Sequence, residues 1–538
     1  MVLRNNWCFI VFIFCLVSCQ NRTPSFDDSY VFRYNEHSNI TSLDPAFAKD
    51  QRNIWAVNQL YNGLVQLDDS LQVKPSIAKN WNISKDGKVY TFSLRDDVYF
   101  HRHALFGIDS TRIVTATDFE YSFYRLLDNN IASPGAWVLQ NVKNFSVISD
   151  SVFQIELKQA FPPFLGLLAM KYCSVVSKEA IEYFGDEYRS NPIGTGPFQF
   201  KLWVENTKLV FRKNPTYFEK DREGNQLPYL EAVAITFLPD KQSELLQFIQ
   251  GNLDFMKSLD ASYKDDIITR DGKLKSKYHQ TISMVIGPYL NTEYLGIYLD
   301  HKNKTLSNQL IRKAINYGFD RKKMLKYLRN NIGTPAINGF VPRGMPSFDD
   351  NLIGFDYDKE KAQKLIEEVK LLDDGNLDPI ILSTNSSYLD LCEFIQNELS
   401  KIGLEIEINV SPPATHRQMV ATSKLSFFRA SWIADYPDAE NYLSLFYSKN
   451  HSPNGPNYTH FKSPKFDALY NKSLSEKNDS IRFNLYNQMD QIIIENAPIV
   501  PLYYDNILRF TQKNISALSN NANNMLVLKR VKKHITND

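Results

Sequence analysis

The sequence predicts an α/β protein of two or three lobes, and three observations indicate this. The chain has 538 residues, which is too many for one small hydrophobic core. Strand-like and helix-like patterns alternate across residues 380–410, as in a βαβ unit of a mixed or parallel sheet. The pair Asp86-Gly87 separates two alternating runs, residues 81–84 and 89–94, which is typical of an antiparallel hairpin.

The first elements follow in a simple order. Tyr30, Phe32 and Tyr34 alternate with other residues and predict a first strand. Residues 53–64 predict a helix that Gly63 closes. The chain contains no internal repeat and no Pro/Gly/Ser-rich linker. We therefore expect the lobes to be joined by strands that cross between them rather than by a flexible tether.

The βαβ pattern lies in the second half of the chain. A short apolar strand at residues 380–383 precedes a helix that Gly403 ends, and a strand of period two follows at residues 404–410. Just before this unit, Asp358 is expected to cap a further helix. The buried stripe of that helix would consist of Ala362, Leu365, Ile366 and Val369.

Composition and motifs exclude several classes of function. The net charge of +1 gives no electrostatic footprint for nucleic acid. Residues 194–198 are rich in glycine but lack the Lys-Ser/Thr of a phosphate loop, so a tight turn into a strand is expected. His101 and His103 have no third ligand nearby and are expected at the surface. We expect no metal site, no cofactor and no enzymatic activity, although the many carboxylates leave a glycosidase pair open.

The N-terminus has the pattern of an export signal. The apolar run 7–17 is too short to span a membrane, and residues 16–19 fit the bacterial lipobox, in which the Cys is lipidated. We therefore expect Cys19 to become the lipid-modified N-terminus; an ordinary secretory signal is the alternative. Of the remaining cysteines, Cys173 and Cys392 are expected to be buried free thiols, with a disulfide between them as the alternative.

The most informative segment for function is residues 431–443. An apolar and aromatic run carries one carboxylate, Asp435, and then breaks at the pair Pro437-Asp438. This pattern predicts a buried strand that ends in a turn, with one acid held where the strand stops. A buried carboxylate needs a cation, which a ligand could supply. A strand whose Asp only caps the following turn explains the segment equally well.

The same segment resembles a family motif. Residues 432–438 are similar to the W-x-A-D-Y-P-D segment of the dipeptide- and oligopeptide-binding proteins that serve ABC importers. Further blocks resemble that family's motifs and stand in family order, at residues 75–95, 194–198, 212–218, 311–321 and 497–503. The sequence departs from the family at residues 101–112, where a longer loop replaces the usual short F-H-D-G-x-x turn.

The resemblance implies an α/β protein with the two-lobed periplasmic-binding-protein type II fold. The first lobe would carry an extra subdomain, and a ligand cleft would lie between the lobes. The expected divisions are a signal peptide at 1–18, a linker at 19–29, the first lobe at 30–64, 191–282 and 500–538, the inserted subdomain at 65–190, and the second lobe at 283–499.

The resemblance also implies a function, namely capture of short peptides and their delivery to the membrane permease of an ABC import system. The peptide would lie in the cleft as an added strand, bonded to the main chain around Ser431, Trp432 and Ile433. Asp435 would pair with the α-ammonium of the peptide. Arg429 would meet the terminal carboxylate, or it would be an Arg exposed on the strand face.

From the first lobe, the loop Asn39-Ile40-Thr41 would face the ligand. We expect a monomer outside the cytoplasm, in the periplasm or at the cell surface, anchored to the membrane through Cys19. The alternatives are a non-peptide cargo such as a nickel complex, haem or an oligosaccharide, a secreted hydrolase, and a surface lipoprotein that scaffolds partners.

Overall fold

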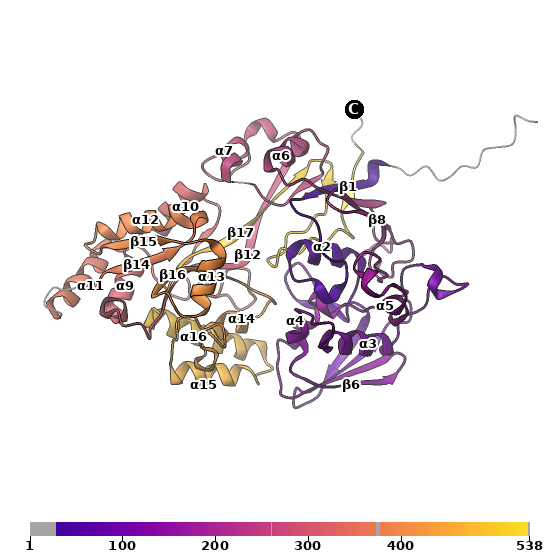
Figure 1. Ribbon diagram of the computed structural model, residues 1–538, viewed down its shortest axis with the longest axis horizontal. Coiled ribbons are helices and arrows are strands. Elements are labelled where there is room, and N and C mark those ends of the chain that lie inside the picture. Colours follow the sequence, from indigo (N-terminus) through magenta and orange to yellow (C-terminus); the bar gives the residue numbers. More distant parts are fainter. Residues whose placement is uncertain (1–27, 260, 373–376, 536–538) are drawn as a thin grey trace, which may run out of the picture.

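Two lobes are joined by two long strands in the computed structural model, which describes residues 28–259, 261–372 and 377–535 (Figure 1). The strands are β12 (Ile282–Ile297) and β17 (Ile499–Gln512), and they pair antiparallel along most of their length. The prediction that crossing strands connect the lobes is therefore confirmed. The predicted signal peptide and Cys19 lie outside the described residues.

One mixed sheet of eleven strands runs through both lobes. Its order is β15-β14-β16-β12-β17-β11-β1-β10-β9-β8, with β13 beside β17. The neighbours of β1 and of β14 are parallel to them, and the other pairs are antiparallel. The remaining strands are β15 (Ile406–Val410), β14 (Ile380–Thr384), β16 (Phe427–Ile433), β11 (Phe255–Met256), β1 (Val31–Glu36), β10 (Ala232–Phe237), β9 (Lys208–Lys213), β8 (Phe198–Val204) and β13 (Thr334–Pro335).

The first lobe carries a separate four-stranded antiparallel sheet, which lies at the lower right of Figure 1. The predicted hairpin is confirmed within it, because β4 and β5 flank a turn in which Gly87 has a φ of +75°. Phe92 is fully buried in the large hydrophobic cluster of the first lobe. The elements are β4 (Ala78–Ile83), β5 (Val89–Leu94), β7 (Val152–Leu157), β6 (Val142–Ser149) and α3 (Ala116–Leu127).

The helix predicted at residues 53–64 ends earlier than expected. α2 (Gln51–Leu60) begins after Asp50, whose carboxylate accepts the Asn53 N–H, and stops three residues before Gly63. The reason is a long-range contact, since the N–H of Gly196 donates to the Leu60 carbonyl at 2.8 Å. A side chain at Gly196 would collide with that helix end. The glycines of residues 194–198 therefore cap α2 and lead into β8, as the tight-turn prediction required.

The second lobe contains the predicted βαβ unit, in which α12 (Leu389–Ser400) connects β14 to the parallel strand β15. The helix predicted after Asp358 is α11 (Lys359–Leu372), and the Asp358 carboxylate accepts the Lys361 N–H at 2.9 Å. The other helices of this lobe are α8 (Lys304–Ser307), α9 (Gln309–Tyr317), α10 (Arg321–Arg329), α13 (Pro413–Ala421), α14 (Glu440–Leu443), α15 (Pro464–Ser473) and α16 (Asp479–Asn496).

Smaller elements complete the first lobe. The hairpin of β2 (Val65–Leu67) and β3 (Val73–Pro75) projects toward the second lobe, where Leu71 joins a hydrophobic cluster with Leu290 and Phe340. Cys173 and Cys392 are buried free thiols, which confirms the first of the two expectations. Within the described ranges, no helix is long and apolar enough to cross a membrane. The other elements are α4 (Phe164–Leu168), α5 (Lys178–Phe184), α6 (Lys241–Ile249), α7 (Lys264–Ile267), β18 (Ile515–Ser516) and β19 (Lys532–Lys533).

Candidate functional site

The edge of β16 is open where the family resemblance places the ligand. On one side, all seven residues of β16 pair with β12. On the other side, β14 pairs only with Phe427 and Phe428. The second half of β16, from Ala430 to Ile433, is half-buried or exposed, so the expectation of a fully buried strand is wrong for this half. An unpaired strand edge of this kind can accept a further strand.

The backbone groups at this edge belong to Ser431 and Ile433. Hydrogen bonds from the Tyr298 N–H to the Ser426 carbonyl and from the Ala434 N–H to the Leu290 carbonyl, both 2.9 Å, set the alternation of the ladder. Even-numbered residues of β16 therefore turn their N–H and C=O groups to β12, and odd-numbered residues turn theirs to the open edge. The Arg429 carbonyl is occupied by the His416 imidazole at 2.8 Å, which leaves Ser431 and Ile433 for a ligand.

Asp435 follows directly after this edge. Asp435 is exposed to solvent. Burial by the surrounding protein nevertheless raises the pKa of its carboxyl above the ordinary value, and a side-chain hydrogen bond with Asn441 opposes this shift. A carboxylate in a concave surface combines these two properties, because its oxygens contact solvent while many protein atoms surround it. No Lys, Arg or His of the described ranges lies within ion-pair distance of it.

The turn after Asp435 is capped by a different acid. The Asp438 carboxylate accepts the Glu440 N–H at 2.9 Å and the Tyr486 hydroxyl at 2.6 Å. Asp435 accepts no backbone N–H bond from any residue that the structure describes. Trp432 is held beside it, because its indole N–H donates to the Asn441 side-chain oxygen at 2.8 Å. This arrangement favours a ligand role for Asp435 over a capping role.

Aromatic residues of the first lobe face this acid across the cleft. Burial raises the pKa of the Tyr172 hydroxyl to about 12, and the charge of Asp435 contributes to that shift, so the two side chains lie within electrostatic range. The ring of Trp137 lies 6.5 Å from the ring of Tyr436. A bound ligand near Asp435 would therefore lie between aromatic walls from both lobes.

Arg429 is buried and already paired. It is 8% exposed, so the alternative of an Arg exposed on the strand face is wrong. Its guanidinium forms an ion pair with the buried Glu293 and lies 3.2 Å from the centre of the Tyr388 ring. Asn291 connects Glu293 to Asp505, and Arg329 pairs with Asp505 at 3.0 Å. The positive and negative charges of this cluster balance.

The first-lobe loop Asn39-Ile40-Thr41 is only partly suited to contact a ligand. The side chain of Ile40 is fully buried in the core, so only its backbone could reach a ligand. The side-chain oxygen of Asn39 accepts bonds from the Trp203 indole at 3.3 Å and from the Asn206 N–H at 3.2 Å. Thr41 is exposed, and its hydroxyl accepts a bond from Asn53 at 2.8 Å.

Two pockets lie between the lobes. One, of about 450 Å³, is bounded by Tyr90 and Gly166 of the first lobe and by Tyr436 and Arg482 of the second. The other, of about 320 Å³, lies on the hinge strands and includes Tyr289, Asp505 and Arg329 together with Lys257 and Asn524. The first pocket includes Tyr436 and Pro437, which follow Asp435 directly, so the region between the lobes has room for a small ligand next to this acid.

The site holds no arrangement for metal chemistry among the described residues, in which no group of three His, Cys, Asp or Glu side chains could bind an ion. His101 is buried rather than exposed, contrary to expectation. Gly194 donates to one of its ring nitrogens at 3.2 Å and the Gly196 carbonyl contacts the other at 3.0 Å. Burial lowers the pKa of His101 to about 4, so it is a neutral structural residue.

Glu293 is the residue of this region that the sequence interpretation missed. It lies in the segment 290–297 directly after Asn291 and Thr292, so it lacks the apolar surroundings that singled out Asp435. Its one local signal was that an acid inside a strand needs a cation, and this does not identify Arg429 as the partner. Tyr172 carried no comparable signal, because aromatic residues are abundant throughout the chain.

Comparisons with known proteins identify the family of this chain. Residues 72–454 match the family model of the bacterial extracellular solute-binding proteins, family 5 Middle. The chain is 27% identical to the oligopeptide-binding protein OppA of Bacillus subtilis (strain 168), over 86% of this chain and 85% of that protein. It is 26% identical to the heme-binding protein A of Haemophilus influenzae, over 82% of this chain and 81% of that protein.

A solved structure is also similar. The ABC transporter-associated periplasmic binding protein DppA from Helicobacter pylori, in complex with the peptide STSA, superimposes with a TM-score of 0.73 at 25% identity. The alignment covers 94% of this chain and 98% of that chain. The predicted type II periplasmic-binding-protein fold is thereby confirmed.

Proposed function

Because the chain belongs to the bacterial extracellular solute-binding proteins of family 5, we propose that it captures short peptides between its lobes and delivers them to the permease of an ABC importer. The observation that carries the proposal is the open edge of β16, which ends at the unpaired Asp435. The family consists of solute-binding transport proteins, and we propose that this chain likewise binds its ligand without transforming it.

The peptide would run antiparallel to β16. Its α-ammonium would pair with Asp435 at the C-terminal end of the strand, and its backbone would then bond to Ile433 and Ser431 in turn. These positions are two residues apart, as an antiparallel ladder requires, and backbone bonding makes the affinity independent of peptide sequence. Asn39, Ile40 and Thr41 would contribute from the first lobe, Ile40 through its backbone alone.

For Arg429 we propose a structural role as the main one. Its charge is balanced by Glu293, so a terminal carboxylate would have to compete with a buried acid for the same guanidinium. A short peptide would therefore be recognised chiefly by its N-terminus. A non-peptide cargo such as haem remains the second candidate, since one similar protein is a heme-binding protein.

Closure of the lobes around the ligand is expected to be measurable. Contacts on both lobes exist together only in the closed form, so binding should favour that form. Adding a bound peptide should reduce the radius of gyration in small-angle scattering and raise the melting temperature, since ligand at 100 times Kd stabilises by about 2.7 kcal/mol. The variant Asp435→Asn at the same peptide concentration is the control. Tight binding without compaction would argue against the hinge mechanism.

For localisation, we propose that Cys19 carries a lipid anchor outside the cytoplasm. The mature protein should begin at Cys19 and partition with membranes, because the lipidated Cys carries more than one acyl chain. Cys19→Ala should leave the protein unprocessed or soluble, whereas Cys15→Ala should still be processed. Mass spectrometry of the N-terminal peptide decides, and an unmodified mature N-terminus at another residue would refute the proposal.

The lobe boundaries expected from the sequence, and a monomeric state, stay part of the proposal.

A further inference from the structure

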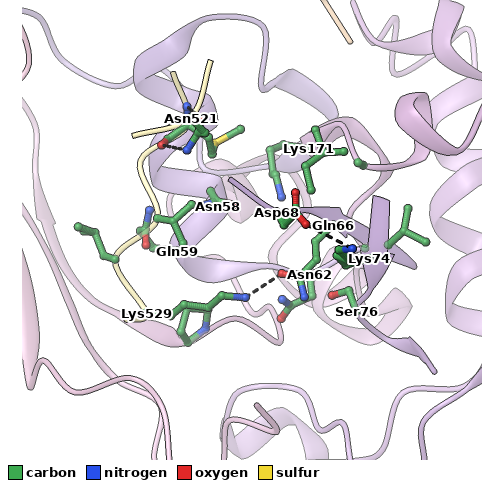
Figure 2. Close-up of a pocket in the computed structure, with 18 of the residues that line it drawn as sticks. Asn58, Gln59, Asn62, Gln66, Asp68, Lys74, Ser76, Lys171, Asn521 and Lys529 are labelled. Atoms are coloured by element: carbon green, nitrogen blue, oxygen red, sulfur yellow. Dashed lines mark hydrogen bonds and ion pairs between the residues drawn. The ribbon is translucent and has the colours of Figure 1, made fainter. Parts of the chain in front are cut away.

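A third, smaller pocket lies inside the first lobe, apart from the region around Asp435. It has a volume of about 140 Å³ and is formed by the end of α2, the β2–β3 hairpin, the short turn that begins at Lys171, and the C-terminal segment 521–530. Figure 2 shows this pocket with its polar side chains. None of its lining residues belongs to the proposed peptide site, so its chemistry needs a separate explanation.

Lys171 is the unusual residue of this pocket. Its side chain is directed toward those of Gln66 and Asp68, which line the same pocket (Figure 2). No acid of the described ranges forms an ion pair with it, and no hydrogen-bond acceptor among them is within reach. Burial lowers the pKa of its ammonium to about 8, and the nearby ammonium of Lys529 contributes to that shift.

Two acids near the pocket, Glu219 and Asp68, already have cations of their own. Glu219 pairs with Lys529 at 2.7 Å, and Lys529 also donates to the Gln66 side-chain oxygen at 2.7 Å. Asp68 pairs with Lys74 at 3.4 Å and accepts two backbone N–H groups at 2.9 Å. The interaction of Lys171 with these acids is therefore limited to long-range electrostatic attraction, without an ion pair.

Several hydrogen-bond donors that line the pocket have no acceptor among the described residues. The Ser76 hydroxyl is buried, and no described residue is its partner. Asn62 uses one N–H on the Tyr217 hydroxyl, and its oxygen is occupied by the Thr195 hydroxyl. Asn58 uses one N–H on the Leu526 carbonyl. Each carboxamide has two N–H groups, so each retains one donor.

We propose that this pocket binds a small anion with carboxylate- or phosphate-type oxygens, held by the ammonium of Lys171 and the donors of Ser76, Asn58 and Asn62. Such an anion would supply the missing counter-charge and acceptors together. Asp69 also lines the pocket and opposes an anion, but Arg530 lines it as well. The volume suits an ion or a small metabolite, and not a peptide.

The test titrates the protein with inorganic phosphate, sodium acetate and sodium chloride at constant ionic strength, by calorimetry and thermal shift. We expect saturable binding of phosphate or acetate, and the stronger of the two identifies the source of the oxygens. Lys171→Met should weaken it at least about tenfold. The control Lys178→Met removes an exposed lysine of the same lobe and should leave it unchanged. Equal responses to all three salts, or full binding by Lys171→Met, would overturn the proposal.

Two further measurements keep the test decisive. If Lys171→Met does not fold, the wild-type protein with ¹³C-methylated lysines can be titrated by NMR, and phosphate or acetate should raise the pKa of the Lys171 amine but not that of the exposed Lys178. An unchanged resonance would overturn the proposal. Asp435→Asn should retain anion binding in full, so that a failure of the peptide proposal and a failure of this one are separate results.

Discussion

Replacing Asp435 by Asn is expected to lower the affinity for short peptides by about two to three orders of magnitude. The change is nearly isosteric but leaves the peptide ammonium without its counter-charge once the lobes have closed over it. Removing one partner of a buried ion pair costs about 3–5 kcal/mol, and each 1.4 kcal/mol is about tenfold in Kd. Calorimetric titration measures the loss, and Glu360→Gln, on the exposed face of α11, is the control.

A peptide with an acetylated N-terminus extends this test. It should bind the wild-type protein poorly, and the two losses should not add, because both remove the same ion pair. If Asp435 only supported the turn, the variant would be less stable with and without ligand and would still distinguish free from acetylated peptides. Additive losses would therefore contradict the assigned role.

The pH dependence follows from the same carboxyl. Burial raises the pKa of Asp435, and only the ionised form attracts an ammonium. Affinity should therefore fall as the pH is lowered through that raised pKa, and Asp435→Asn should lose this dependence. Using C-terminally amidated peptides removes the titration of the terminal carboxyl, and the α-amino group, with a pKa of about 7.7–8.0, stays protonated throughout.

The second large effect is expected on stability, at Glu293. This residue is 3% exposed and its partner Arg429 is 8% exposed, so Glu293→Met leaves a buried guanidinium without a counter-charge. We expect the free energy of unfolding to fall by about 3–5 kcal/mol. The double variant Glu293→Met/Arg429→Met should lose less than the sum of the single losses, because neither charge is then left alone. Urea denaturation measures all three.

The control for this prediction is an exposed ion pair. Arg95 and Asp97 lie 2.7 Å apart at the surface, so Asp97→Asn should change stability by less than about 1 kcal/mol. If Glu293→Met were equally harmless, the buried pair would have no structural role.

In Glu293→Gln the guanidinium of Arg429 is released, and peptides with a free carboxylate should then gain affinity over amidated ones.

Local patterns predicted the elements of this fold well. The hairpin at Gly87 and the βαβ unit around α12 follow from periodicity and turn chemistry, which act over a few residues. The end of α2 was placed wrongly because the Gly196 N–H, more than a hundred residues away in sequence, takes the Leu60 carbonyl. Contacts of that kind are absent from any local window of sequence.

The candidate site shows the same division. The position of Asp435 at the end of a strand could be predicted, since one acid in an apolar run is a local signal. The burial of Arg429 could not, because Glu293 lies 136 residues away along the chain and meets it only through the pairing of β12 with β16. The facing Tyr172 belongs to the other lobe and depends on how the lobes meet.

Native mass spectrometry of the protein as purified tests the central claim most directly, with fragmentation of whatever ligand it retains. We predict adducts whose masses and fragments correspond to peptides of a few residues, present on the wild-type protein and largely absent from Asp435→Asn. A retained haem, metal complex or sugar, or peptides carried equally by both proteins, would contradict the account.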